Sequence, residues 1–435
     1  MQLINNQYQI QGLNVLDICA EFDTPLYLYD AETISEKIRA LQSAFDGLNL
    51  KIKYAGKALT NVSILRFMKS QGVGLDVVSV QEAQLGLMAG FEPADIMYTP
   101  NCVSFDEIQQ GVEMGLMVNL DNLPALEQFG QTFGGRIPCC IRVNPHIAAG
   151  GNHKIQTGHA DSKFGISVLQ LAQVKQMVDT YAIDIVGLHL HTGSDFKSAH
   201  VFMQGAQVLF DAARDYPNLR FIDFGSGFKV AYREGDAVTD MEELGAQLKK
   251  AFGAFCASYG RELEIWFEPG KFLVSECGYL LVKANVVKQT PARTFVGVNS
   301  GLNHLIRPMM YDAYHDIINV SNPNSGTPEV YTVVGYICET DTLGWDRTLN
   351  EVKAGDILAL KNAGAYGFSM SSNYNSRFRP AEVLVYQGEA RLIRRRETMD
   401  DILKNQIMLE FEPEEAKVSA QKEERLVRQG ADRAS

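Results

Sequence analysis

Residues 52–79 have the sequence "IKYAGKALTNVSILRFMKSQGVGLDVVS", and this stretch contains the pattern that decides the fold. It starts with a short apolar run at 52–58, continues with an amphipathic helical pattern at 61–72 that ends in glycine, and closes with a second apolar run at 73–79. A strand, a helix with a C-terminal glycine and another strand are typical of a parallel β-α-β unit. The stretch therefore predicts a parallel sheet covered by helices.

The same alternation continues as far as residue 272. Apolar runs rich in β-branched residues are separated by helical patterns such as 169–181 and 241–260. Eight strands with helices between them favour a (β/α)8 barrel of the TIM type, and a doubly wound open sheet is the structural alternative. The six further runs lie at 95–100, 116–121, 139–145, 185–194, 221–228 and 264–272.

The pattern changes after Phe272, because the next apolar runs have no comparable helices between them. This change predicts a separate, mainly antiparallel β domain. We expect a barrel domain over 30–275, a β domain made of 1–29 with 276–410, and a charged C-terminal tail over 411–435. Since the tail has no aromatic residue beyond Phe411, we expect a frayed helix or a disordered segment without catalytic function.

Composition narrows the class of protein. A chain of 435 residues, 46% of them hydrophobic, is long enough for two domains. It has no apolar run of about 18 residues and no basic-then-apolar N-terminal segment, which predicts a cytoplasmic protein without a membrane partner. A net charge of −12 argues against nucleic acid as a partner. The seven cysteines are scattered without CxxC spacing, which indicates reduced thiols and no metal centre.

Several of the predicted strands end in polar residues. In barrels of this kind the active site lies at the carboxyl ends of the strands, so these residues are candidate functional residues. They are Lys57 after the first run, Asp76 in the second, His189, His191 and Ser194 at the sixth, Gly225, Ser226 and Gly227 at the seventh, and Glu268 and Lys271 at the eighth.

Lys57 follows a buried strand, where an amine must either find a counter-charge or lower its pKa through desolvation. The second case is typical of lysines that form Schiff bases, and a lysine that merely extends to solvent from a strand end is the structural alternative. The turn at 225–227 offers free backbone N–H groups to a phosphate near the seventh and eighth strands, although glycine turns are also ordinary structure.

Glu268 has two interpretations. It could hold a proton on a pyridine nitrogen, or it could form an ion pair with Lys271 or Arg142. His189 and His191 lie on the same face of a strand, but a third metal ligand is not evident, so stacking of one imidazole on an aromatic cofactor ring is favoured over metal binding. Lysine, glycine-rich turn, histidine and glutamate together fit pyridoxal 5'-phosphate better than any other cofactor.

Longer motifs make the chain similar to a known family. "RVNP" (142–145), "TGHADSKFG" (157–165), "RPMMY" (307–311), "CETDTLG" (338–344) and a long motif at 364–385 occur in the order seen in diaminopimelate decarboxylases, which are fold type III pyridoxal-phosphate enzymes. The resemblance covers about residues 20–400. It implies a barrel plus a β domain, a head-to-tail homodimer with shared active sites, and decarboxylation of meso-2,6-diaminopimelate to L-lysine and CO2, the last step of lysine biosynthesis.

The resemblance also implies roles for the cofactor-binding residues. Lys57 would bind the cofactor covalently, and Asp76 would help to set the charge around this lysine. His191 would stack on the ring, while Glu268 would contact the pyridine nitrogen. The residues expected to bind the phosphate are Ser194, Gly225, Ser226, Gly227 and Tyr366.

A second set of implied roles concerns the substrate. Arg307 and Tyr311 would bind its distal carboxylate. Lys271 is expected to contact the substrate, and the cofactor phosphate is its alternative partner. Cys338 and Glu339 would enter from the partner subunit. The glutamate would contact the distal ammonium, and the cysteine would give a proton to the reacting carbon.

The sequence departs from the family pattern at three places, and each departure affects only the details of contacts within the site. Lys271 stands where the family usually has arginine, which replaces a bidentate contact by a point charge. Ser226 replaces the middle glycine of the turn. The family's "CESGD" becomes "CETDT", which moves the second carboxylate one place earlier, to Asp341, and leaves its role open.

Rival functions differ in particular residues. A sister decarboxylase acting on ornithine, arginine, lysine or carboxynorspermidine would differ in the distal pocket, and "RPMMY" with "CE" argues against it. An inactive dimerising homologue that serves as a binding protein should have lost Lys57 or Cys338, and both are present. A racemase of this fold would need a tyrosine in place of Cys338.

Overall fold

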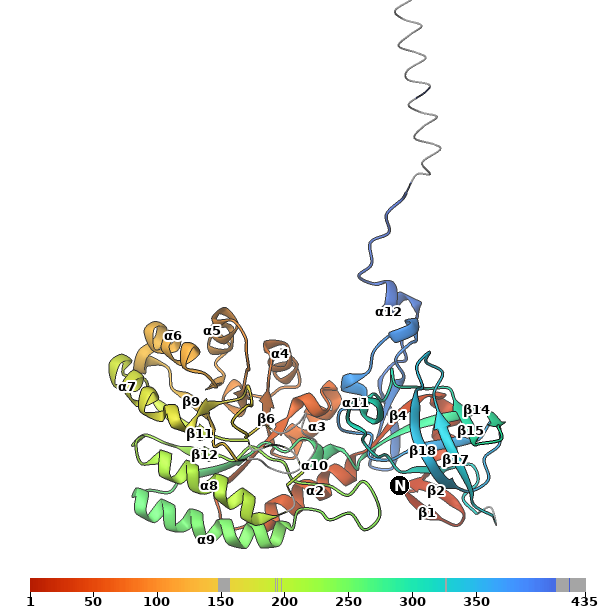
Figure 1. The fold of residues 1–435 in the computed structure, drawn as a ribbon, viewed down its shortest axis with the longest axis horizontal. Coiled ribbons are helices and arrows are strands. Elements are labelled where there is room, and N and C mark those ends of the chain that lie inside the picture. Colours follow the sequence, from red (N-terminus) through yellow and green to blue (C-terminus); the bar gives the residue numbers. More distant parts are fainter. Residues whose placement is uncertain are drawn as a thin grey trace, which may run out of the picture. The chain divides into compact units, whose positions relative to one another are not determined.

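The structure is a computed structural model, shown in Figure 1, and it describes residues 1–147, 157–191, 193, 195–196, 198–324, 327–411 and 422. Contacts divide the chain into a compact unit of residues 1–396 and a second unit of residues 397–435. The first unit contains the described strands. The second contains the short helix α12 (Met399–Leu403).

Eight parallel strands form a closed barrel in the first unit. Strands adjacent in the chain pair in parallel around the ring, and β13 pairs with β5 to close it. The predicted (β/α)8 barrel is therefore confirmed, and the doubly wound open sheet is wrong. The strands are β5 (Leu50–Ala55), β6 (Gly74–Val77), β7 (Ile96–Tyr98), β8 (Met117–Leu120), β9 (Cys139–Asn144), β11 (Ile185–His189), β12 (Phe221–Asp223) and β13 (Glu264–Phe267), and β10 (Ile166–Ser167) lies beside β9.

Helices cover the outside of the barrel, and Figure 1 shows α4 to α9 arranged around the strands. Most of them begin at a side chain that accepts a backbone N–H of the first turn, such as Asn61, Ser79, Ser104 and Asp240. Such N-caps stop each helix from extending back into the preceding loop. The helices are α2 (Ala31–Ala44), α3 (Val62–Ser70), α4 (Val80–Met88), α5 (Phe105–Glu113), α6 (Leu123–Phe133), α7 (Leu171–Tyr181), α8 (Ala199–Ala213), α9 (Met241–Tyr259) and α10 (Lys271–Val274).

Aromatic side chains fill the barrel on the side of the strands' amino ends. The rings of Phe221 and Trp266 stack with their centroids 3.7 Å apart. Lys53 is buried beside them, with its Nζ 4.5 Å from the centre of the Trp266 ring, and it donates to the Asp95 carbonyl. In barrels of this type the active site lies at the opposite end, at the carboxyl ends of the strands.

The second large sheet is mixed and mostly antiparallel, as predicted. Only the β15–β17 and β4–β20 pairs in it are parallel among the described strands. A small sheet of β1 (Gln2–Ile4), β2 (Gln7–Ile10) and β3 (Leu13–Asn14) precedes α1 (Val15–Phe22). The large sheet contains β4 (Leu26–Asp30), β14 (Gly278–Gln289), β15 (Thr294–Val298), β16 (Ile317–Asn319), β17 (Glu329–Val334), β18 (Thr342–Leu349), β19 (Ile357–Leu360), β20 (Ala381–Tyr386) and β21 (Glu389–Arg394).

The domain boundaries at 30 and 275 remain a proposal. They agree with β4, which ends at Asp30 in the second sheet, and with β14, which returns to it at Gly278. Apart from Phe411 and Lys422, the predicted tail over 411–435 lies outside the described residues. None of the described helices is both long enough and apolar enough to cross a membrane.

Candidate active site

A cavity of about 490 Å³ lies at the carboxyl ends of the barrel strands, and residues after 300 complete its wall. The loop that carries Tyr366 is fixed to the barrel, because the Tyr366 N–H donates to the Ala58 carbonyl at 2.9 Å. Ser194 lies outside the described residues. The predicted site residues that line the cavity are Lys57, Asp76, His191, Ser226, Gly227, Glu268, Lys271, Arg307, Tyr311 and Tyr366.

Lys57 stands in a single helical turn, η1 (Gly56–Ala58), directly after β5. Its side chain is exposed because it extends into the open cavity, although protein surrounds it on the other sides. The surrounding protein disfavours the charged ammonium and by itself would lower the pKa of Lys57. The charges of Tyr366, Asp76 and Glu268 outweigh this effect, and the pKa of Lys57 is raised above its ordinary value. Of the two possibilities left by the sequence, the structure thus favours the counter-charge over a pKa lowered by desolvation.

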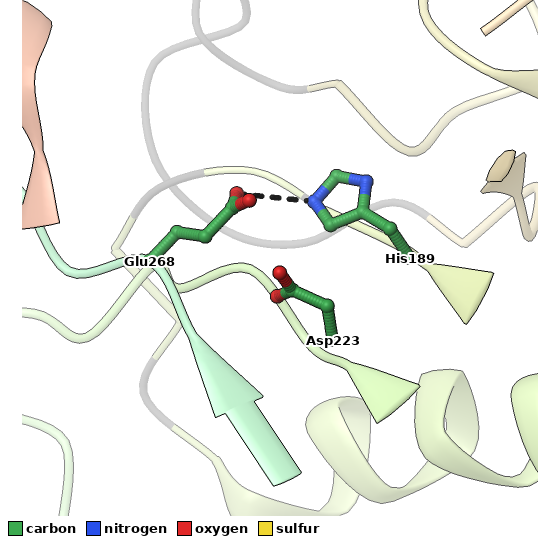
Figure 2. Close-up of side chains that lie close together, drawn as sticks. All are labelled: His189, Asp223 and Glu268. Carbon is green, nitrogen blue, oxygen red and sulfur yellow. Dashed lines mark hydrogen bonds and ion pairs between the residues drawn. The ribbon is translucent and has the colours of Figure 1, made fainter. Parts of the chain in front are cut away.

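Glu268 follows β13 and points toward His189 at the end of β11, as Figure 2 shows. Its Oε2 lies 3.1 Å from the His189 Nε2, so the predicted alternative of an ion pair with Lys271 or Arg142 is wrong. Burial alone would raise the pKa of this carboxyl, but His189, Lys57 and Asp223 together lower it to about 2. Glu268 is therefore an anion, and its buried Oε1 has no hydrogen-bond partner among the described residues.

Asp223 is the third side chain of this group, and the sequence-based prediction did not include it. Its Oδ1 accepts the Gly225 N–H at 2.8 Å, which fixes the start of the glycine turn. Burial first, and then the charge of Glu268, raise the pKa of Asp223 well above its ordinary value. His189, Asp223 and Glu268 each offer one atom of a type that can bind a metal ion, and these three atoms lie within 4.8 Å of one another. The sequence signal was the position of Asp223 at the strand end, next to the turn.

The turn at 225–227 needs glycine at both ends. Gly225 and Gly227 have φ angles of 59° and 113°, and a Cβ on Gly225 would lie 2.7 Å from the His191 Nδ1. The Ser226 N–H donates to the same Nδ1 at 3.3 Å, which holds the imidazole against the turn. Burial, followed by the charges of Arg142 and Lys57, lowers the pKa of His191 well below its ordinary value. A neutral ring and a glycine cradle therefore face the cavity together.

Lys271 and Arg307 are two of the cations that line the cavity, and they have different partners. The Lys271 Nζ lies 2.6 Å from Oδ1 of Asp195, so this lysine is paired with an acid. Arg307 begins α11 (Arg307–Tyr311), and its Nη1 donates to the Tyr232 hydroxyl at 3.2 Å. Within the described part of the chain, no carboxylate forms an ion pair with Arg307.

Cys338 and Glu339 lie outside the cavity of their own chain. Both are exposed in the loop between β17 and β18, where Asn375 donates to the Cys338 Sγ at 3.2 Å and Tyr374 donates to Glu339. Asp341 is buried instead. Its two carboxylate oxygens accept backbone N–H groups at 2.6 and 2.8 Å, so it holds the loop in place and does not extend to the surface.

Comparisons with known proteins agree on one family. The family described as "Pyridoxal-dependent decarboxylase, pyridoxal binding domain" matches residues 31–275. A diaminopimelate decarboxylase of Methanothermobacter thermautotrophicus is 37% identical, over 91% of this chain and 95% of that protein. The chain belongs to the diaminopimelate decarboxylase family. The Escherichia coli K12 diaminopimelate decarboxylase is 36% identical, over 92% of this chain and 98% of that protein.

A solved structure of the same family shares the fold. The crystal structure of Helicobacter pylori diaminopimelate decarboxylase complexed with L-lysine has a TM-score of 0.83 and 30% sequence identity, and it covers 90% of this chain and 98% of that one. The present chain is thus a pyridoxal-phosphate-dependent decarboxylase of fold type III.

The cavity of this decarboxylase family member fits pyridoxal phosphate. The Lys57 amine extends into the cavity, the glycine turn forms a cradle that a Cβ would fill, and the unpaired Oε1 of Glu268 is an acceptor for a protonated ring nitrogen. Lys57, the turn at 225–227, His191 and Glu268 would hold the cofactor. Their individual roles remain predictions.

Proposed function

We propose that the protein decarboxylates meso-2,6-diaminopimelate to L-lysine and CO2, the last step of lysine biosynthesis. The observation that carries the proposal is one cavity lined both by Lys57 and by Arg307, a guanidinium that no described carboxylate neutralises. The most similar relatives named above are diaminopimelate decarboxylases. One related structure is a complex with L-lysine, the proposed product.

Near Lys57, the side chains would set the charge on the cofactor and supply the proton that the reaction needs. Pyridoxal phosphate, when bound, supplies an electron sink for the electrons left behind when the α-carboxylate departs. The anionic Glu268 would keep a proton on the ring nitrogen, and the neutral His191 would pack on the ring. Lys57 would hold the cofactor covalently until the substrate amine takes its place, and its ammonium, like the thiol of Cys338, is a group that could supply a proton to the reacting carbon.

At the other end, Arg307, Tyr311 and Lys271 bind the distal carboxylate. A substrate without this carboxylate leaves a buried guanidinium without its anionic partner. Unpaired buried polar groups of this kind cost on the order of several kcal/mol, which selects against lysine and ornithine as substrates.

We also propose a head-to-tail homodimer in the cytoplasm, in which Cys338 and Glu339 enter the partner's cavity. The exposure of both side chains outside their own cavity supports this arrangement. The loop that carries them is anchored by the buried Asp341. In the partner's cavity, Cys338 would give the proton to the reacting carbon, and Glu339 would bind the distal ammonium.

The substrate is tested with purified holoenzyme and meso-diaminopimelate, ornithine, arginine and lysine in separate reactions. We expect CO2 release from diaminopimelate alone, with L-lysine formed in equal amount. Turnover of ornithine or arginine without turnover of diaminopimelate would identify a sister decarboxylase. An absence of turnover with all four, in protein that has bound pyridoxal phosphate, would favour the inactive binding homologue.

A further inference from the structure

Arg307 is held by two neutral acceptors. Its Nη1 donates to the Tyr232 hydroxyl at 3.2 Å and lies 3.4 Å from the His315 Nε2. The guanidinium also stands over the Tyr232 ring, at 5.2 Å from its centre. Arg307 and His315 are both buried, so these contacts fix the orientation of the Arg307 side chain.

The protonation state of His315 follows from its surroundings. Its Nδ1 lies 2.8 Å from the Lys361 carbonyl oxygen, which can only accept, so the ring proton is on Nδ1. Burial, followed by the charge of Arg307, lowers the pKa of this imidazole to about 3, and Arg347 acts in the same direction. The Nε2 therefore presents a lone pair to Arg307 at any pH at which the enzyme works.

Lys271, another cation that lines the cavity, shows what a charged partner would do. Lys271 is paired with the carboxylate of Asp195, so a bound anion must compete with an internal one. A neutral acceptor orients Arg307 equally well and leaves its whole charge for the ligand, because imidazole and phenol carry no charge of their own. The guanidinium is thus oriented in advance and not neutralised.

We propose that His315 is a positioning residue that sets the preference for substrates with a distal carboxylate. It acts by holding Arg307 through a neutral acceptor. The inference rests on the proposed function, because it assumes that Arg307 binds that carboxylate.

Four variants of the holoenzyme test the proposal by equilibrium binding of L-lysine, which keeps the distal carboxylate, and of cadaverine, which lacks it. His315→Gln places a neutral acceptor near the Nε2 position, and the isosteric His315→Glu places an anionic one there. His315→Asn keeps a donor for the Lys361 carbonyl, but its side chain is too short to place its acceptor oxygen at the Nε2 position that faces Arg307. Arg307→Gln is the reference for loss of the carboxylate contact.

We expect wild type and His315→Gln to bind L-lysine with affinities within about threefold of each other, since the net value of one neutral hydrogen bond is preserved. His315→Glu and His315→Asn should bind L-lysine about tenfold more weakly, which corresponds to about 1.4 kcal/mol. Cadaverine affinity should stay unchanged in His315→Gln and His315→Asn. Circular dichroism checks the fold, and the Gln and Glu pair decides the question if His315→Asn does not fold.

Three results distinguish a failure of the inference about His315 from a failure of the proposed function. If His315→Glu binds L-lysine as tightly as His315→Gln, or if every His315 variant loses both ligands equally, His315 is only structural and the inference is wrong. If Arg307→Gln loses the preference for L-lysine and the His315 variants keep it, the inference fails while the proposed function stands. If wild type shows no preference for L-lysine over cadaverine, the proposed carboxylate contact itself fails.

Discussion

Lys57 is the residue on which the proposed chemistry depends, and its surroundings are unusual for a lysine. The side chain extends into the cavity while Asp76 and Glu268 help to keep its ammonium charged. Two further lysines, Lys163 and Lys271, line the same cavity. The assignment of the covalent attachment to Lys57 can therefore be tested against neighbours with the same functional group.

Lys57→Ala should lose the yellow colour of covalently bound pyridoxal phosphate, because no amine remains at that position. Borohydride reduction followed by peptide mass spectrometry should find the cofactor on the peptide with Lys57 in wild type and on no peptide in the variant. Lys271→Ala is the matched control and should keep the label. A label that persists in Lys57→Ala would refute the assignment.

His315 makes a prediction about pH. Its pKa is about 3 when folded and about 6.5 when unfolded, so between these values the unfolded chain binds more protons and stability falls as pH falls. From pH 7 to pH 5 this amounts to about 2 kcal/mol. The loss in unfolding free energy over this range should be smaller by that amount in His315→Gln, measured by urea titration. Equal losses in both proteins would contradict the neutral state of His315.

The loop between β17 and β18 is the element whose role the sequence left open. Asp341 does not replace the family's displaced carboxylate, because it is buried with its two oxygens on the Leu302 and Ile337 N–H groups. This aspartate has a positive φ of 45° and determines where Cys338 and Glu339 emerge. The displaced acid thus has a structural function.

Asp341→Ala should destabilise the protein by about 2–4 kcal/mol, since two buried N–H groups lose their acceptor. Asp341→Asn keeps one acceptor oxygen and should lie between the alanine variant and wild type. Glu339→Gln, on the exposed side of the same loop, should change stability by less than about 0.5 kcal/mol. Thermal unfolding measures all three, and an unchanged melting temperature in Asp341→Ala would show that the loop does not depend on this residue.

The sequence predicted the strands and helices better than it predicted the side-chain contacts between them. The eight barrel strands and most strands of the second sheet follow from local periodicity and glycine punctuation, which are properties of adjacent residues, whereas β16 and β18 were not predicted. The pairs Glu268 with His189 and Lys271 with Asp195 depend on side-chain direction at strand ends and in loops far apart in the chain. For the same reason Asp223 and His315 were missed, although each lies next to a motif that was noticed.

At the scale of the whole molecule, the proposed homodimer makes each site depend on two chains. Lys57→Ala and Cys338→Ala should each be inactive alone. Mixed in equal amounts with random exchange of chains, they should recover up to about a quarter of the sites, because half of the dimers then contain one intact site. Exchange is verified with two affinity tags. No recovery despite verified exchange would place both residues in the site of one chain.

We propose that one cavity recognises an amino acid by its reacting end at Lys57 and by its distal carboxylate at Arg307. The most direct measurement is the ratio of kcat/KM for meso-diaminopimelate to that for L-lysine, in wild type and in Arg307→Gln. We predict that the substitution lowers this ratio by about a hundredfold or more, since the site then lacks the group that distinguishes the two. A ratio that stays the same while both rates fall together would contradict the claim.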